Sequence, residues 1–164
     1  MTKKMLVIAG AMTLAAFATA QTSGPSGVSA RIGAVWPSEG DTLFGIGLDY
    51  KFQSVPVEPA RNAYWSYLGA SIDYYGEDGD NYNIPLAITY NVRSNQLVFA
   101  AGLSYNFLRL GGNDDNGLGA TLSASYDFGE SEVPGQTPFF VQAKYFFTPD
   151  SDANALGLYL GARF

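Results

Sequence analysis

The chain has 164 residues, a formal charge of −6, and neither cysteine nor histidine. Its acidic balance argues against a nucleic-acid partner, because nucleic acids favour basic surfaces. Without cysteine there is no disulfide framework, and without histidine or cysteine the usual Ser–His and Cys–His nucleophiles are excluded. Charged residues make up only 15% of the chain while aromatic residues make up 15%, and this balance is unusual for a soluble domain.

The first residues have the pattern of a secretory signal peptide. Lys3 and Lys4 give a positive start, Met5–Phe17 is apolar, and a small-x-small motif ends at Ala20. This pattern predicts a signal peptide over residues 1–20 that is cleaved after Ala20. The alternative is an uncleaved anchor, but the apolar run is shorter than the roughly 20 residues that a spanning helix needs.

A short tail at 21–27, predicted to be periplasmic, is followed by a long alternation of apolar and polar residues. The alternating segments are 28–36, 44–52, 64–74, 82–92, 97–107, 118–128, 139–147 and 156–164. Period-two patterning predicts strands, and a tilted strand crosses a bilayer in about 9–11 residues. The sequence therefore predicts an all-β fold, an eight-stranded antiparallel up-and-down transmembrane β-barrel with short loops over 28–164.

One face of each predicted strand is apolar, and the other carries glycine, hydroxyl and charged residues. In such a barrel the outward aromatic residues gather at the two ends, for example Trp36 and Tyr105 at one rim and Tyr50 and Tyr126 at the other. Two aromatic girdles around an aliphatic belt are typical of bilayer interfaces. The alternative, a soluble periplasmic lipocalin-like carrier, would place the apolar face inside.

Together with the signal peptide and the aromatic last residue, this pattern resembles the small eight-stranded outer-membrane barrels of the OmpA/OmpX-like superfamily. The resemblance implies a monomer in the bacterial outer membrane, surrounded by its lipid. It also implies that the last strand, with Leu160, Ala162 and Phe164, is recognised by the outer-membrane assembly machinery. We expect no additional periplasmic domain.

Charges of both signs fall on the predicted lumen face. They are Arg31, Asp49, Lys51, Asp73, Asp127, Lys144 and Arg163. If the first hairpin turns at 37–41, Arg31 and Asp49 become cross-strand neighbours. A narrow lumen tolerates charges when they are paired, so we interpret the set as a neutralised interior. The alternative is an ion path.

Bulky residues are also predicted to point inward, namely Trp65, Tyr67, Phe140, Phe146 and Tyr159. Strands opposite them contribute glycine, so large and small residues would fill the barrel together. The alternative is a pocket for an aromatic ligand.

The turns at the rim opposite the chain ends hold nine of the 15 acidic residues. Asp78, Asp80, Asp114 and Asp115 have the oxygen chemistry that divalent cations prefer, although neither loop matches a twelve-residue calcium motif. We favour simple solvation of these loops, with a weak cation site as the alternative.

No activated nucleophile can be recognised, although a Ser–Lys or paired-carboxylate site stays open. Barrel enzymes that act on lipid A exist, and those would be expected to use histidine with serine. The sequence therefore leads us to expect an integral outer-membrane protein with a structural, envelope-interaction role, a packed non-catalytic lumen and no cofactor. The alternatives are a small-solute or ion channel and the soluble carrier.

Overall fold

The computed structural model describes residues 27–52, 55–56, 64–77, 79–128 and 139–163. The predicted signal peptide at 1–20, most of the tail and Phe164 lie outside these residues, as does the side chain of Trp65. Within the described part, no helix is both long enough and apolar enough to span a bilayer.

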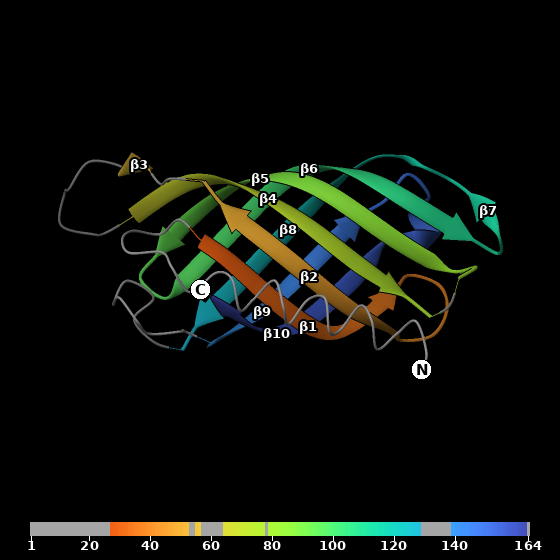
Figure 1. Ribbon diagram of the computed structural model, residues 1–164, viewed down its shortest axis with the longest axis horizontal. Coiled ribbons are helices and arrows are strands. Elements are labelled where there is room, and N and C mark those ends of the chain that lie inside the picture. Colours follow the sequence, from red (N-terminus) through yellow and green to blue (C-terminus); the bar gives the residue numbers. More distant parts are fainter. Residues whose placement is uncertain (1–26, 53–54, 57–63, 78, 129–138, 164) are drawn as a thin grey trace.

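Strands make up nearly all of the described chain (Figure 1). The long strands are β1 (Gly27–Pro37), β2 (Leu43–Lys51), β4 (Tyr64–Gly76), β5 (Tyr82–Ser94), β6 (Leu97–Leu110), β8 (Gly117–Asp127), β9 (Phe139–Phe147) and β10 (Ala155–Arg163). The two-residue strands β3 (Val55–Pro56) and β7 (Asn113–Asp114) extend β4 and β6 at their ends. A 3₁₀ turn, η2 (Ser151–Ala153), precedes β10.

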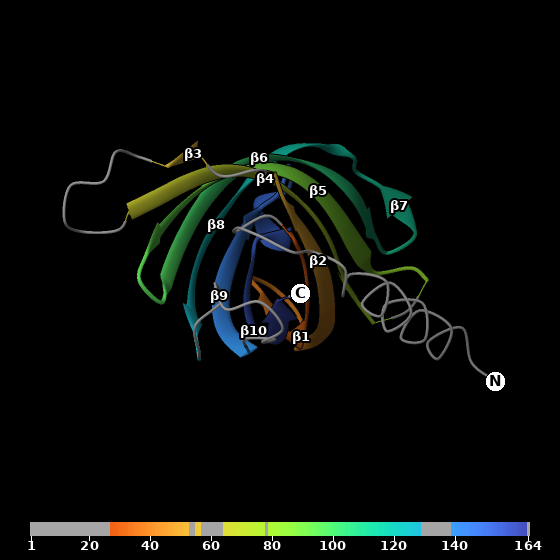
Figure 2. The same ribbon diagram turned by 60° about the vertical axis from the view of Figure 1, so that its left-hand side comes forward.

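The sheet closes on itself. Each of the eight long strands pairs antiparallel with the next one along the chain, and β10 pairs back with β1 from Ser29↔Arg163 to Pro37↔Ala155. Figure 2 shows the strands curving around a common lumen. Closure pairs both edges of every long strand and leaves no open edge in the wall. The prediction of an eight-stranded antiparallel barrel is confirmed.

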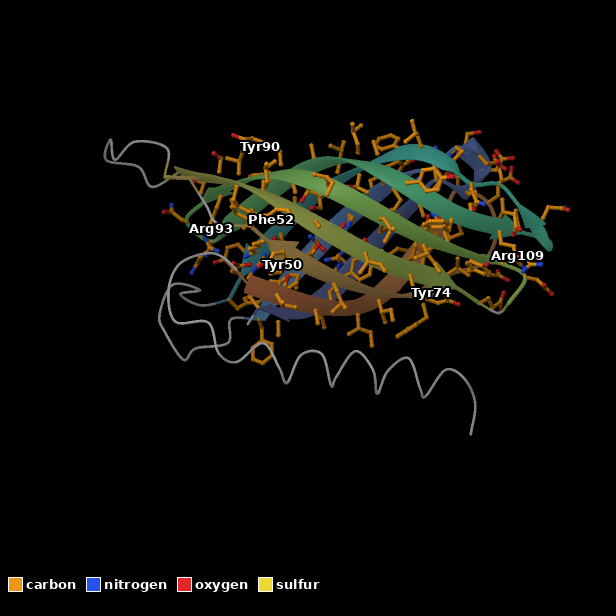
Figure 3. All side chains as sticks on the ribbon, turned by 45° about the horizontal axis from the view of Figure 1, so that its top comes forward. Tyr50, Phe52, Tyr74, Tyr90, Arg93 and Arg109 are labelled. Carbon is orange, nitrogen blue, oxygen red and sulfur yellow. The ribbon has the colours of Figure 1, made fainter. Side chains whose placement is uncertain are left out.

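Large apolar side chains cover the outside of the wall, and Figure 3 shows Tyr50, Phe52 and Tyr90 among them. Leu103 in the aliphatic belt is 77% exposed, and Leu118, which pairs with Tyr105 near one end of the barrel, is 79% exposed. The outward aromatics form edge-to-face pairs near both ends, among them Tyr50–Phe52 and Tyr105–Phe107. An apolar exterior with aromatic ends is the surface that a bilayer requires. A lipocalin-like carrier would instead have its apolar side chains inside the barrel.

We call the end where β1 begins and β10 ends the terminal rim, and the opposite end the far rim. Toward the far rim the lumen is filled by an apolar cluster of Val35, Tyr75, Phe146, Ala155 and Tyr159. All five side chains are at most 3% exposed.

Glycines make room for the largest of these rings. A Cβ at Gly45 would lie 3.0 Å from the Tyr159 hydroxyl, and a Cβ at Gly157 would collide with the Tyr159 ring. This large-against-small arrangement matches the predicted filling of the barrel by Phe146 and Tyr159, whereas Tyr75 belongs to the cluster without having been expected there.

Candidate functional site

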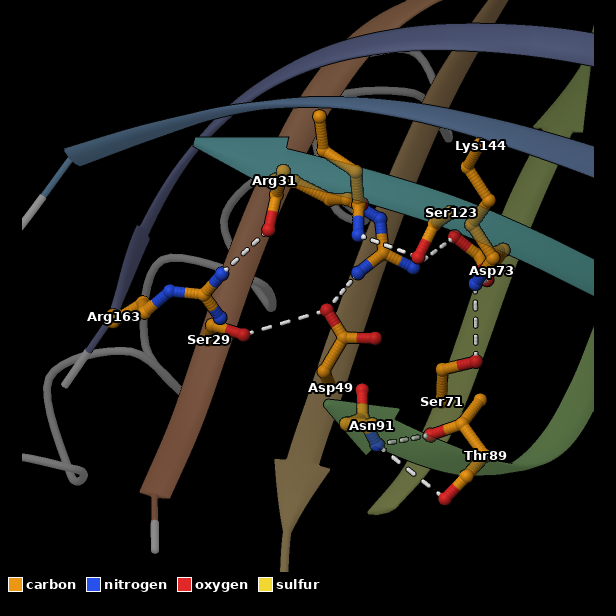
Figure 4. Close-up of polar contacts among 12 residues, drawn as sticks. Ser29, Arg31, Asp49, Ser71, Asp73, Thr89, Asn91, Ser123, Lys144 and Arg163 are labelled. Carbon is orange, nitrogen blue, oxygen red and sulfur yellow. Dashed lines mark hydrogen bonds and ion pairs between the residues drawn. The ribbon is translucent and has the colours of Figure 1, made fainter. Parts of the chain in front are cut away.

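Below the apolar cluster the lumen is polar, and its middle holds four charges and one serine. Strand alternation turns Arg31 of β1, Asp49 of β2, Ser71 and Asp73 of β4, and Lys144 of β9 inward. We call these five residues the central cluster (Figure 4). They come from strands on both sides of the lumen, so only barrel closure brings them together.

Ion pairs and hydrogen bonds connect the whole central cluster. The Arg31 guanidinium pairs with the Asp49 carboxylate and, at 2.5 Å, with Asp73 Oδ1. Lys144 Nζ lies 2.6 Å from Asp73 Oδ2 and donates to Ser71 Oγ at 3.1 Å. Two cations face two carboxylates, so the cluster is neutral overall and meets the requirement that buried charges be paired.

Gly47 makes the cluster possible. In the register Arg31 lies opposite Gly47 on β2, and Gly47 lies opposite Asp73 on β4. A Cβ at Gly47 would come within 2.7 Å of Arg31 Cζ and would collide with the Asp73 carboxylate. The absence of a side chain therefore lets Arg31 reach across β2 to Asp73.

A second charged group lies closer to the terminal rim, and we call it the terminal cluster. It consists of Lys51, Arg93, Asp127 and Arg163, each at most 8% exposed. Arg163 Nε lies 2.9 Å from Asp127 Oδ1, and Arg93 NH1 lies 3.0 Å from Asp127 Oδ2. One carboxylate thus serves two guanidinium groups.

Lys51 takes no part in these ion pairs. Its Nζ lies over the Tyr67 ring, 5.4 Å from the centroid, and it has no hydrogen bond or ion pair with the residues that the structure describes. The two clusters are separated by a cavity of about 30 Å³ that Lys51, Lys144 and Arg163 all line. One water needs roughly 10–15 Å³ of such space, so the cavity has room for about two waters or one small ion.

The seven charged residues predicted for the lumen are all there, but the pairing differs in detail. Asp49 lies opposite Ser29 in the register, and Arg31 reaches it diagonally. The predicted strand ends at residue 92, yet β5 continues to Ser94 and Arg93 faces the lumen at 4% exposure. The alternation of β5 indicates this position, because Asn91 and Arg93 continue the every-second-residue pattern of the side chains that face the lumen.

The acidic loops at the far rim stay apart from the lumen site. Asp114 forms an exposed pair with Arg109 at 3.7 Å, and Asp78 lies outside the described residues. Among the residues that are described, no three acidic side chains gather into a group that could hold a metal ion.

Chemically, the central cluster offers one arrangement besides ion pairing. Ser71 supplies a hydroxyl, Lys144 an amine within hydrogen-bond distance of it, and Asp73 a carboxylate that orients the amine. Nucleophile, base and orienting group in hydrogen-bonded sequence form the general plan of a covalent catalytic site. The sequence left a Ser–Lys site open without identifying its members.

Comparison with known proteins places the fold. No family model matches the chain, and no curated protein matches its sequence. Among solved structures it is similar to the outer membrane enzyme PagL, with a TM-score of 0.52 and 15% identity, over 84% of this chain and 97% of that chain. The chain therefore has the fold of an outer-membrane barrel.

This likeness corrects our expectation of function. We expected a structural, non-catalytic barrel and no enzyme, and that expectation is contradicted because the same fold carries an outer membrane enzyme. That expectation rested on the pairing of the lumen charges and on the lack of a recognisable activated nucleophile in a chain without histidine or cysteine. The absence of histidine and cysteine excludes Ser–His and Cys–His sites only, whereas a serine beside a lysine needs neither.

Proposed function

We propose that this chain is an outer-membrane barrel enzyme with a hydrolytic centre formed by Ser71, Lys144 and Asp73. The observation that carries the proposal is the 3.1 Å distance between Ser71 Oγ and Lys144 Nζ inside the lumen. The likeness to an outer membrane enzyme supports it at the level of the fold. The apolar exterior with its two aromatic ends supports a place in the bacterial outer membrane, reached through a cleaved signal peptide and the assembly machinery.

In the resting cluster Lys144 is an ammonium that donates to Ser71 Oγ and Asp73. The proposed reaction begins when this ammonium has released a proton to solvent; Ser71 Oγ then attacks the carbonyl carbon of an ester, and the resulting neutral amine accepts the hydroxyl proton. The proton then passes to the leaving alcohol, which leaves an acyl group on Ser71. Water activated by the same amine hydrolyses the acyl-enzyme and restores the serine. Asp73 holds the amine at 2.6 Å, and Arg31 holds Asp73 in turn at 2.5 Å.

The surroundings of Ser71 restrict the substrate class. Ser71 is 6% exposed, and the cavity beside Lys144 holds about two waters. That volume suits the hydrolytic water, while a substrate has to displace lumen side chains to reach the serine. Small acyl esters are therefore the expected class.

The test combines covalent labelling with hydrolysis by the refolded barrel in detergent micelles. A fluorophosphonate probe should modify Ser71, as peptide mass spectrometry would show, and p-nitrophenyl acetate should be hydrolysed. Ser71→Ala should lose both signals. Ser104→Ala is the matched control, because Ser104 is an equally buried lumen serine that bonds Asn106 at 3.2 Å instead of a lysine.

Lys144→Arg separates catalysis from ion pairing. Arginine keeps the positive charge beside Asp73 but does not give up a proton at accessible pH, so it cannot act as the base. Hydrolysis should fall at least tenfold while the barrel still folds and shifts on a denaturing gel. An unlabelled wild-type protein, or equal turnover in wild type and Ser71→Ala, would assign these residues to ion pairing alone and refute the proposal.

A further inference from the structure

We infer that the lumen beside the terminal rim binds a small monovalent inorganic anion of about the size of chloride. The site lies in the cavity between Lys51 and the hydroxyl groups of β5 and β8. The inference goes beyond the proposed hydrolytic centre and does not depend on it.

The first support is charge. The central cluster balances two cations with two carboxylates, whereas the terminal cluster has three cations, Lys51, Arg93 and Arg163, and the single carboxylate of Asp127. The described residues therefore leave two positive charges uncompensated in a narrow lumen. Buried charges without partners are costly, so this region favours a bound anion.

The second support is the position of Lys51. It is 7% exposed and lines the cavity, and its amino group lies over the Tyr67 ring. Among the described residues, no carboxylate forms an ion pair with it. The other lumen lysine, Lys144, has both a carboxylate and a hydroxyl as partners. Lys51 is thus a largely buried lysine whose amino group has no hydrogen-bond acceptor among the described residues.

The third support comes from the hydroxyls of the cavity wall. Ser125 Oγ accepts from Arg163 at 2.9 Å, Thr89 Oγ1 accepts from Asn91 at 2.9 Å, and Ser123 Oγ accepts from Gln142 at 3.3 Å (Figure 4). Each hydroxyl accepts through a lone pair and keeps its own proton to donate. The wall can therefore present donors to a ligand inside the cavity.

One carboxylate also lines the cavity, and it is already occupied. Asp49 pairs with Arg31 and accepts from Ser29 at 3.3 Å, so its charge is compensated within the central cluster. The volume of about 30 Å³ limits the ligand. It has room for a single halide ion.

The experiment measures thermal unfolding of the full barrel in micelles, in sodium chloride and in sodium gluconate at equal ionic strength. Chloride should raise the Tm in a saturable way, because a ligand that binds only the folded state stabilises it. Chlorine-35 NMR should show line broadening that bromide competes away. Equal Tm values in the two salts together with unbroadened chloride lines would overturn the inference. This outcome includes the case in which acidic residues outside the described part supply the negative charge that balances the terminal cluster.

Variants identify the site. Lys51→Met should lose the chloride dependence and should be at least as stable as wild type in gluconate, because it removes an unpaired buried cation. Lys51→Arg should keep the dependence. Arg109→Gln at the far rim is the control for net charge, since Arg109 is 37% exposed and distant from the cavity. An undiminished chloride response in Lys51→Met would place the anion elsewhere and refute the assignment.

Discussion

Asp127→Asn tests how far a single carboxylate holds the terminal rim of the lumen together. The Asp127 side chain is fully buried and pairs with two guanidinium groups, at 2.9 Å to Arg163 and 3.0 Å to Arg93. Removing one partner of a buried ion pair costs about 3–5 kcal/mol, because the remaining charge stays buried without compensation. Asparagine has nearly the same shape, so the loss would be electrostatic and not a loss of packing.

The free energy of unfolding can be measured by urea titration of the barrel in lipid vesicles, followed by tryptophan fluorescence and by the gel shift of the folded form. Asp114→Asn is the matched control, because its pair with Arg109 is long and its side chain is 67% exposed. Exposed pairs of this kind contribute roughly 0–1 kcal/mol. Adding Arg93→Gln to Asp127→Asn should recover part of the loss, since it removes one stranded cation. A loss below about 1 kcal/mol in the single variant would refute the reasoning, because it would mean that solvent already compensates these charges.

Three further predictions follow from the two faces of the wall and from the packing of the lumen. Leu122→Arg should destabilise folding into vesicles by about 2–4 kcal/mol, because Leu122 is half exposed on the lipid face, whereas Ser123→Glu on the lumen face, opposite Lys144 in the register, should be tolerated better; equal tolerance would mean that the faces are misassigned. Gly47→Ala should cost about 1–3 kcal/mol by pushing the central cluster apart, as urea unfolding would show, while Gly79→Ala, with open space around it, should change little. Planar-bilayer recordings should show no large stable pore in the wild type, and Tyr159→Ala should raise the conductance because it empties the middle of the apolar cluster; a wild type that conducts strongly would contradict the packed lumen.

The strands and their faces could be predicted from the sequence because both depend on local alternation. Lipid on one side and a polar lumen on the other impose a strict period of two, so Leu103 and Leu118 could be placed outside and Arg31 and Asp127 inside. The ends of strands depend less on alternation and are harder to predict. The alternation of β5 continues through Arg93, but a turn-like Ser-Asn sequence directly after it made the strand look shorter than it is.

The candidate site could not be predicted in the same way, because it depends on register and closure. Ser71 and Lys144 belong to β4 and β9, which are not neighbours in the sheet and meet only across the lumen. The relative shift of strands around a barrel is set by the stagger of the whole sheet. Alternation determines on which side of the wall a residue lies, but it does not determine the position of the residue along the barrel axis. For this reason Asp49 was expected opposite Arg31, whereas the structure places Gly47 there.

The seam between β1 and β10 has a consequence for how the barrel assembles. β1 is the first strand of the barrel along the chain and β10 is the last, and the register pairs Ser29 of β1 with Arg163 of β10. The barrel therefore cannot close until β10 is in place. Until then β1 and β10 each carry a row of unpaired peptide groups, which hydrocarbon does not tolerate. Any partly built sheet is therefore unstable inside a bilayer, and pairing of distant segments is slow. Insertion and closure should thus occur as one cooperative event, with the cost of joining the two ends of the sheet dominating the folding barrier.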